Sequence, residues 1–210
     1  KLGGTPTATN SAGAGNIPTA GSVKIDGVNK PDALLGTLPI LQLSANTLAG
    51  MSVGSFTGNQ TASQTVPHGL SKAPELVVHK NLDAADGWWV GSLQPLASLD
   101  FTDYLARNNT TARADHYSAW QDLNPTATLT SVGIQAGTNI SGPNRFEAYH
   151  SVPGYSRIGA YVGNGDADGS FVHCGFRPSY VLTKYINSTS DWRVWDTARN
   201  TYNISMESLK

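Results

Sequence analysis

Residues 163–178, GNGDADGSFVHCGFRP, contain side chains that could bind a metal ion. Asn164, Asp166 and Asp168 stand at alternate positions before a glycine, as oxygen ligands do in the first half of a calcium-binding loop. The twelfth position of such a loop needs a bidentate glutamate, and here it is Gly175. We therefore keep these three residues as weak metal candidates. We expect a polar loop in which they cap their own backbone, with no metal and no cofactor.

The same stretch holds the only cysteine, Cys174, next to His173. Neighbouring residues of a strand point to opposite faces, so these two side chains cannot form a nucleophile–base pair with each other. Paired carboxylates would be another route to catalysis, but no spacing selects two of them. The aspartates in expected loops or strand ends are Asp83, Asp86, Asp166, Asp168, Asp191 and Asp196. The sequence therefore predicts a protein that is not an enzyme.

Five tryptophans and eight tyrosines offer flat side chains for binding. Trp88 and Trp192 occupy matching positions in two similar stretches, and core packing explains a repeated tryptophan best. Their strand neighbours point to the opposite face, where they could stack on sugar rings or pack against another subunit. The binding candidates are Trp89, Trp195, Arg193 and Tyr185.

An internal repeat defines the elements that must position these candidates. Residues 50–90 and 154–194 share the order of their glycines, aromatic residues, polar loop and short β-rich runs. The best-matched residues are Pro74 with Pro178, Lys80 with Lys184 and Trp88 with Trp192, each pair displaced by 104 residues. We interpret the two stretches as a duplicated β unit with one strand–loop–strand path. Each repeated lysine is expected to bind a neighbouring carbonyl or carboxylate.

The local patterns are those of strands. ELVVHK and SYVLTK are short β-rich runs after a proline, and RFEAYHSV alternates with a period of two. Many short strands with Gly, Asn and Pro turns favour an all-β fold, a β-sandwich or jelly-roll-like domain of two related halves. In the second half we expect a loop at 164–169 that leads into a strand at 170–174.

We expect two parts along the chain. Residues 1–49 are predicted to be an extended N-terminal arm or linker, because residues 1–22 have almost no large apolar side chain and cannot form a core. Other chains should order that segment. Residues 50–210 are predicted to form the duplicated sandwich domain, with repeat units at about 50–90 and 154–194.

Composition excludes some partners. Lys and Arg number 14, Asp and Glu number 15, and the net charge of −1 provides no basic surface for nucleic acid. No run of 18 apolar residues is present, so no membrane insertion is expected. The single cysteine excludes an internal disulfide and a multi-cysteine zinc site.

Several stretches together resemble a β-rich repeat domain common in structural proteins of tailed phages. They are SANTLAGMSVGSFTGN, TVPHGLSKAPELVVHKN, GWWVGS, GYSRIGAYVGNGDADGSFVHCGFRPSYVLTK and DWRVWDTARNTYN. The GFRP and D-x-x-R-x-x-Y-N motifs are the most distinctive parts, and the resemblance covers residues 16–205. It implies no catalytic residues.

The resemblance implies a virion protein, in a tail or head fibre, that acts by binding in host attachment or assembly. The expected partners are other virion proteins and a host cell-surface glycan, and the expected state is a homo-oligomer, since several copies together strengthen weak contacts. A capsid-decorating or adaptor protein is the alternative within binding proteins. A glycan-cleaving enzyme is the alternative from another class.

Overall fold

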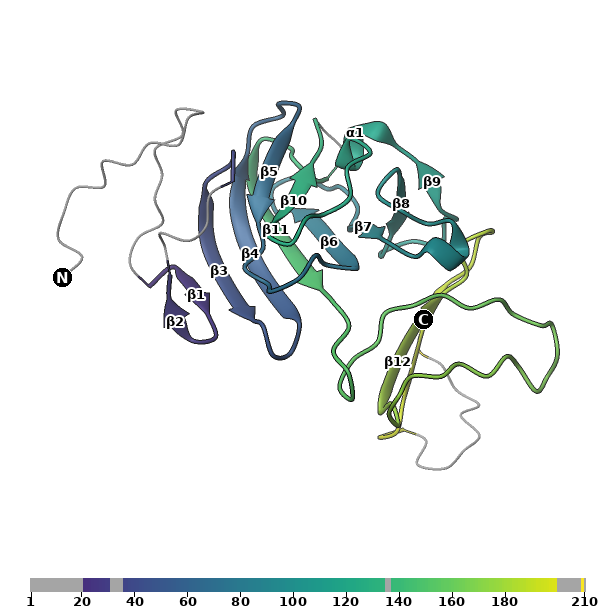
Figure 1. Ribbon diagram of the computed structural model, residues 1–210. Helices are drawn as coiled ribbons and strands as arrows, with labels where there is room; N and C mark the ends of the chain where they lie inside the picture. The colour runs from purple at the N-terminus through teal and green to yellow at the C-terminus, as the bar shows by residue number, and fades with distance from the viewer. Residues whose placement is uncertain (1–20, 31–35, 135–136, 200–208, 210) are drawn as a thin grey trace, which may run out of the picture.

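The computed structural model describes residues 21–30, 36–134, 137–199 and 209, and these form an almost entirely β structure (Figure 1). The strands are β1 (Val23–Ile25), β2 (Val28–Asn29), β3 (Ile40–Asn46), β4 (Met51–Gly58), β5 (Gln64–Pro67), β6 (Leu76–Asn81), β7 (Trp89–Ser92), β8 (Asp103–Ala106), β9 (Ala114–Asp115), β10 (Leu129–Val132), β11 (Gly142–Tyr149), β12 (Tyr180–Lys184) and β13 (Trp192–Asp196). Two short helical turns are described, the 3-10 helix η2 (Pro95–Ala97) and α1 (Tyr117–Trp120). The all-β prediction is confirmed.

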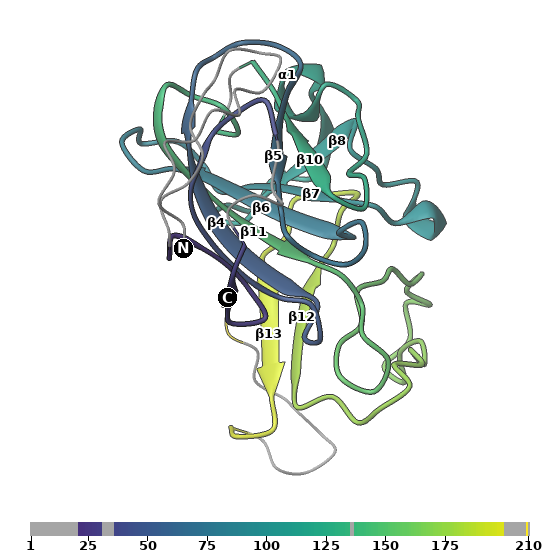
Figure 2. The same ribbon diagram turned by 60° about the vertical axis from the view of Figure 1, so that its left-hand side comes forward.

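Nine strands form one large sheet in the order β2-β1-β3-β4-β11-β6-β7-β8-β9. Its neighbouring strands are antiparallel, except that β1 runs parallel to β3. Strands β5 and β10 pair with each other and lie over one face of this sheet (Figure 1, Figure 2). The third pair, β12 and β13, lies apart from them (Figure 2).

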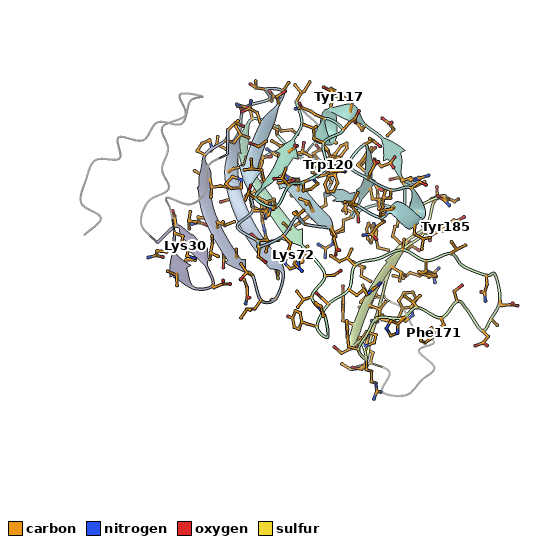
Figure 3. All side chains as sticks on the ribbon, viewed as in Figure 1. Lys30, Lys72, Tyr117, Trp120, Phe171 and Tyr185 are labelled. Carbon is orange, nitrogen blue, oxygen red and sulfur yellow. The ribbon has the colours of Figure 1, made fainter. Side chains whose placement is uncertain are left out.

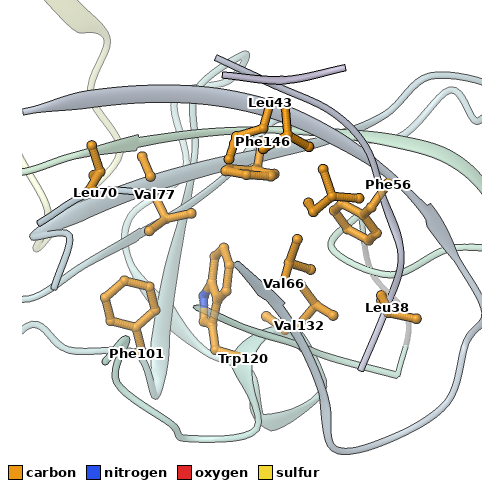
Figure 4. Packing of buried hydrophobic residues seen from close by; sticks show 14 residues of the cluster. Leu38, Leu43, Phe56, Val66, Leu70, Val77, Phe101, Trp120, Val132 and Phe146 are labelled. Carbon is orange, nitrogen blue, oxygen red and sulfur yellow. The ribbon is translucent and has the colours of Figure 1, made fainter. Parts of the chain in front are cut away.

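The main core fills the space between the large sheet and the β5–β10 layer (Figure 4). Alternate residues of the sheet point into it, since side chains of a strand face opposite sides in turn. Phe56 of β4 and Phe146 of β11 meet Trp120 of α1 there, and all three are fully buried. The other buried members of this cluster are Val23, Leu38, Ile40, Leu43, Val66, Leu70, Val77, Phe101, Ala119, Val132 and Ala148.

The sheet begins before the domain boundary expected at residue 49. Strand β3 pairs with β4 along its length, and Leu43 is buried in the main core. Val23 of β1 is fully buried as well, although its surroundings in the sequence are polar. The extended arm is therefore shorter than residues 1–49, because apolar side chains as early as Val23 belong to the sheet. Residues 1–20, where the arm was expected to be ordered by other chains, lie outside the described residues.

The repeat is real at the level of strand pairing. In the first unit (residues 50–153), β6 pairs with β7 with Leu76 opposite Ser92 and His79 opposite Trp89. In the second unit (residues 154–209), β12 pairs with β13 with Tyr180 opposite Asp196 and Thr183 opposite Arg193. Each partner is displaced by 104 residues, so the two antiparallel pairs have the same register.

The structural repeat extends beyond the expected end at residue 194. Val90 of β7 pairs with Leu105 of β8, and Val194 of β13 exchanges backbone hydrogen bonds with Leu209 at 3.0 and 3.1 Å. Val194 follows Val90 by 104 residues, and Leu209 follows Leu105 by the same number. The second unit thus reproduces the position of a third strand, which sequence comparison missed because YLAR and SLK share only one residue.

The N-terminal part of the second unit differs from that of the first unit. Strand β3 precedes the first unit and forms a hairpin with β4, whereas β11 precedes the second unit at the matching position. Strand β11 already pairs with β4 on one edge and with β6 on the other. It has no edge left for the residues that follow, and the hairpin shrinks to one bridge between Val152 and Ser156. Residues 157–179, here called the connecting loop, contain no strand.

The second unit packs against the face of the large sheet that points away from the main core. A second buried cluster, on the face of the sheet opposite the main core, contains Val78, Val90, Leu99 and Leu105. Trp88, Trp192 and Ile186 pack against it, so the predicted packing role of the two repeated tryptophans is confirmed. The indole N–H of Trp192 donates to the carbonyl of Ala106 at 2.8 Å.

Both repeated lysines bind backbone carbonyls, as expected. Lys80 donates to the carbonyl of Ala84 at 2.9 Å within its own β6–β7 loop. Lys184 donates to the carbonyls of Ser190 and Thr110, the latter at 3.0 Å, and therefore joins the two units. Burial lowers the pKa of Lys184, against the attraction of Asp191.

Replacing Trp192 by alanine should loosen the second unit from the first. The change removes an indole from the second cluster and the hydrogen bond to Ala106, so the β12–β13 pair should open more often. We expect amide hydrogen exchange in β12 and β13 to become about tenfold faster or more, while β4 and β11 keep their protection. Trp195→Ala, on the opposite face of the same strand, is the matched control. Equal exchange rates in the wild type and Trp192→Ala would contradict this docking.

Candidate functional site

Two of the four predicted binding residues lie on one face of the β12–β13 pair. In the β12–β13 pair, Trp195 stands opposite Val181 and Arg193 stands opposite Thr183. Because side chains alternate along a strand, all four lie on the same side of the pair. We call these four residues the open face. Val181 and Arg193 are exposed, and Trp195 and Thr183 are half-buried. The matching face of the first unit carries Val77 and points into the main core.

Trp195 stands at the position of Gly91 in the first unit. A Cβ on Gly91 would lie 2.5 Å from a ring carbon of Phe101 and 2.9 Å from Trp120, so that position must lack a side chain. The largest side chain of all occupies the same place in the second unit. The open face therefore cannot be covered in the way that Phe101 and Trp120 cover Gly91 in the first unit.

Tyr185 directly follows β12 and is 57% exposed (Figure 3). It lies at the end of the strand pair that adjoins the first unit, where the N–H of Arg113 donates to the carbonyl of the next residue, Ile186, at 2.9 Å. At the other end, the Arg199 guanidinium binds Asp196 at 2.7 Å. The backbone N–H of Arg199 and then its side chain hold the pKa of Asp196 below its usual range.

Trp89 does not join the other candidates. It lies in the first unit, half-buried, with its ring centroid 4.1 Å from that of Tyr104 and 5.5 Å from that of His116. A Cβ on Gly137 would come within 1.9 Å of its indole, so the ring is held tightly in place. Its indole nitrogen is buried and finds no hydrogen-bond partner among the described residues. Trp89 is a packing residue whose neighbours come from distant parts of the sequence.

The connecting loop adds apolar side chains to the second unit. Phe171, which is labelled in Figure 3, is 91% exposed, and Val162 of the same loop is 73% exposed. Three exposed residues of this unit match fully buried residues of the first. Tyr161 and Phe56 each stand two residues before a Gly-Asn pair, Val172 and Val66 each stand three residues before a glycine (Gly175 and Gly69), and Val181 and Val77 occupy the same position in the repeated strand. The second unit thus presents to solvent the side chains that form a core in the first.

The metal candidates lie on the connecting loop and are exposed. The side-chain oxygen of Asn164 accepts a hydrogen bond from the N–H of Asp166 at 3.1 Å, which is the capping that we expected. Gly165 has a φ of +78°, a conformation open to glycine. Among the described residues, no three His, Cys, Asp or Glu side chains gather around a common point.

The predicted strand at 170–174 is wrong. Its counterpart in the first unit, β5, exists because it pairs with β10 along four residues. Within the part of the chain that is described, no strand pairs with residues 170–174. A strand pattern without a pairing partner leaves its backbone groups to water, and the segment stays irregular.

A buried carboxylate on the back of the large sheet is already fully engaged. Glu147 of β11 binds Arg107 at 3.4 Å and Arg145 at 3.1 Å, and it accepts a hydrogen bond from the hydroxyl of Tyr149 at 2.9 Å. Burial first, and then the negative charge of Glu147, raise the pKa of Tyr149 to about 12. This cluster accounts for the charge that β11 buries, and we assign it a structural role.

Sequence reasoning missed Val181, Thr183 and Phe171 as parts of the exposed surface. A signal was present in the repeat itself. Where one copy has a glycine and the other has a tryptophan at the corresponding position, as with Gly91 and Trp195, the same layer of side chains cannot cover both copies. Comparing the copies position by position, rather than for identity, would have located the open face.

The fold and the site define a class: an all-β protein with a repeated strand pair, one copy of which exposes its apolar face. The chain belongs to a family known as a domain of unknown function, DUF7483, which it matches over residues 36–210. No curated protein and no solved structure matches the chain. Among the described residues, neither helical turn approaches the length or apolarity needed to span a membrane.

Proposed function

We propose that this protein acts by binding, as a structural component of a phage virion in a tail or head fibre. The observation that carries the proposal is the exposure of core-type side chains in the second unit. Val181 is 37% exposed where Val77 of the first unit is fully buried. Val181 and Trp195 are cross-strand neighbours, and an apolar surface exposed in this way favours contact with another molecule.

The chemistry of the open face suits a sugar or a protein partner. An indole presents an apolar surface on which a sugar ring can stack, and Arg193 beside it supplies hydrogen-bond donors for hydroxyl or carboxylate groups. Tryptophan and arginine also carry much of the energy at protein interfaces. The host surface and a neighbouring virion protein are therefore the partners that we propose.

The virion role rests on the resemblance of the repeat and its GFRP motif to the β-rich domains of tailed-phage structural proteins. The structure adds a physical reason for such a role. Trp192 and Lys184 attach the second unit to the first through hydrogen bonds, so the sandwich of the first unit supports the open face. A fibre protein needs such a support because weak contacts become strong when many copies engage together.

Purified particles of the phage that encodes the chain provide the test. An antibody against the chain should label intact particles at a tail or head fibre in electron micrographs. The soluble chain should also compete with particles for adsorption, and Trp195→Ala should weaken competition by about tenfold or more. Tyr117→Ala, an exposed aromatic residue of α1 that is 54% exposed, is the matched control. A chain that is absent from purified particles would refute the virion role.

A further inference from the structure

We propose that strand β12 pairs, edge to edge, with β12 of a second copy of this chain across a two-fold axis. The inference concerns an edge of the second unit and does not rest on the virion role. It starts from the backbone hydrogen bonds of β12, which identify the groups that its partner strand leaves unused.

Hydrogen bonds of an antiparallel pair involve every second residue of each strand. The carbonyl of Ser179 accepts from the N–H of Thr197 on the β13 side, at 3.0 Å. Val194, which stands opposite Leu182, directs its N–H and carbonyl away from β12 and towards Leu209. The odd-numbered residues therefore bond to β13. The N–H and carbonyl groups of Tyr180, Leu182 and Lys184 face the other edge, where no strand lies within the described chain.

The first unit shows what this edge accepts. The same edge of β6 is filled by β11, which runs antiparallel with Val78 opposite Glu147. One of its hydrogen bonds joins the N–H of Leu82 to the carbonyl of Pro143 at 2.9 Å. Since β6 and β12 have the same register against their partners, the edge of β12 is shaped for an antiparallel strand as well.

The edge of β12 lacks the features that keep exposed strands apart. Natural edge strands carry charges, prolines or bulges that block pairing. Strand β12, YVLTK, has no proline, and its pairing with β13 is free of bulges. Its one charge, Lys184, is turned to the carbonyls of Ser190 and Thr110. Tyr180 and Val181 add exposed apolar surface, with 56% and 37% of each residue accessible.

A second β12 strand meets the requirements of this edge. Two copies related by a two-fold axis perpendicular to the sheet are antiparallel by symmetry, which is the direction β11 takes in the first unit. With Leu182 opposite its own copy, Val181 falls opposite Thr183 and Tyr180 opposite Lys184, so no like charges meet. The end strands of the large sheet, β2 and β9, have only two residues each and could not fill this edge.

The pairing would join the two open faces on one side of a four-stranded sheet. Trp195 and Val181 of each copy would continue into Thr183 and Arg193 of the other, and the two Val181 side chains would lie diagonally across the two-fold axis, since a perpendicular axis keeps equivalent faces on the same side. The dimer would therefore present twice the surface of a single chain to any partner.

Sedimentation velocity over a wide concentration range tests the proposal on the full chain. The wild type should form a dimer, and Leu182→Pro should raise its dissociation constant by about tenfold or more, because proline removes the central N–H of the edge. The matched control is Leu182→Ala, which loses the same side chain but keeps the N–H. A wild type that stays monomeric, or a dimer unchanged by Leu182→Pro, would overturn the proposal.

Amide hydrogen exchange gives a second readout that needs no substitution. The amides of Tyr180, Leu182 and Lys184 should gain protection as the concentration rises, while those of Val181 and Thr183, already bonded to β13, should change little. A second pair of variants, Tyr180→Lys and Val181→Lys, should separate likewise. The first places a lysine opposite Lys184 of the second copy and should weaken the dimer more than the second, which places a lysine opposite Thr183. Free exchange of the even-numbered amides in a sample shown to be dimeric would place the interface elsewhere.

Discussion

Trp120→Ala should cost about 3 to 5 kcal/mol of unfolding free energy, the range for removing a large aromatic side chain from a core. Trp120 is fully buried at the end of α1, with its ring centroid 5.3 Å from that of Phe101 and 5.2 Å from that of His79. The surrounding residues belong to two layers tied by backbone hydrogen bonds, so they cannot collapse into the space left behind. Chemical denaturation at neutral pH, followed by circular dichroism, measures the loss.

Trp195→Ala is the matched control for this experiment. Both changes remove an indole, but Trp195 lies half-buried on the open face, which no second layer of strands covers in the described part of the chain. Its loss should lower the unfolding free energy far less than the loss of Trp120. Equal losses in the two variants would show that the second unit has a packed core of its own and would contradict the open face.

The strand pairs could be predicted because their determinants are local. Proline before the strand, lysine at its end and tryptophan at the start of the next strand recur with the same spacing, and short-range hairpin pairing follows from them. The β6–β7 and β12–β13 pairs therefore have the same register in the structure. The direction of Trp88 relative to Trp89 was also predictable, because side chains alternate along any strand.

The differences between the copies could not be predicted because they depend on competition for distant partners. Strand β11 pairs with β4 on one side and with β6 on the other. Neither edge of β11 is therefore free to pair with the residues after Gly154. Nothing in the local sequence of residues 157–179 records that loss. The strand expected at 170–174 fails for the same reason, since its pattern is sound and its partner is missing.

The candidate site was predictable in part. Alternation placed Arg193 and Trp195 on a common face, and the structure keeps them there. Trp89 had the same local pattern, but the rings of Tyr104 and His116, which come from later segments of the chain, pack against its indole. Exposure depends on which segment packs over a face, and that is a property of the whole fold rather than of the strand.

The second large effect concerns pH and arises from His79. This residue of β6 is fully buried among the rings of Phe56, Phe146 and Trp120. Burial lowers its pKa to about 3, although the nearby Thr138 backbone acts in the opposite direction. Burial also lowers the pKa of His68, so both buried histidines favour the neutral form in the folded state.

The sign of the effect follows from proton linkage. An unfolded histidine binds a proton below a pH of about 6.5, whereas folded His79 stays neutral until the pH approaches its own lowered pKa. The unfolded state therefore binds more protons in this window, and stability falls as the pH falls from about 6.5 towards 3. His79 alone should lower the unfolding free energy by about 2 to 3 kcal/mol between pH 7 and pH 4.5, at roughly 1.4 kcal/mol per pH unit.

His79→Leu should remove this part of the pH dependence. Leucine is apolar, close to histidine in volume and unable to bind a proton, so the difference in unfolding free energy between pH 7 and pH 4.5 should shrink by about 2 to 3 kcal/mol. Urea denaturation of both proteins at the two pH values measures it. His173→Leu, on the exposed connecting loop, is the matched control and should leave the difference as in the wild type. If His79→Leu and the wild type lose the same stability on acidification, His79 is not buried in its neutral form, and the packing of the core around it must differ from the structure.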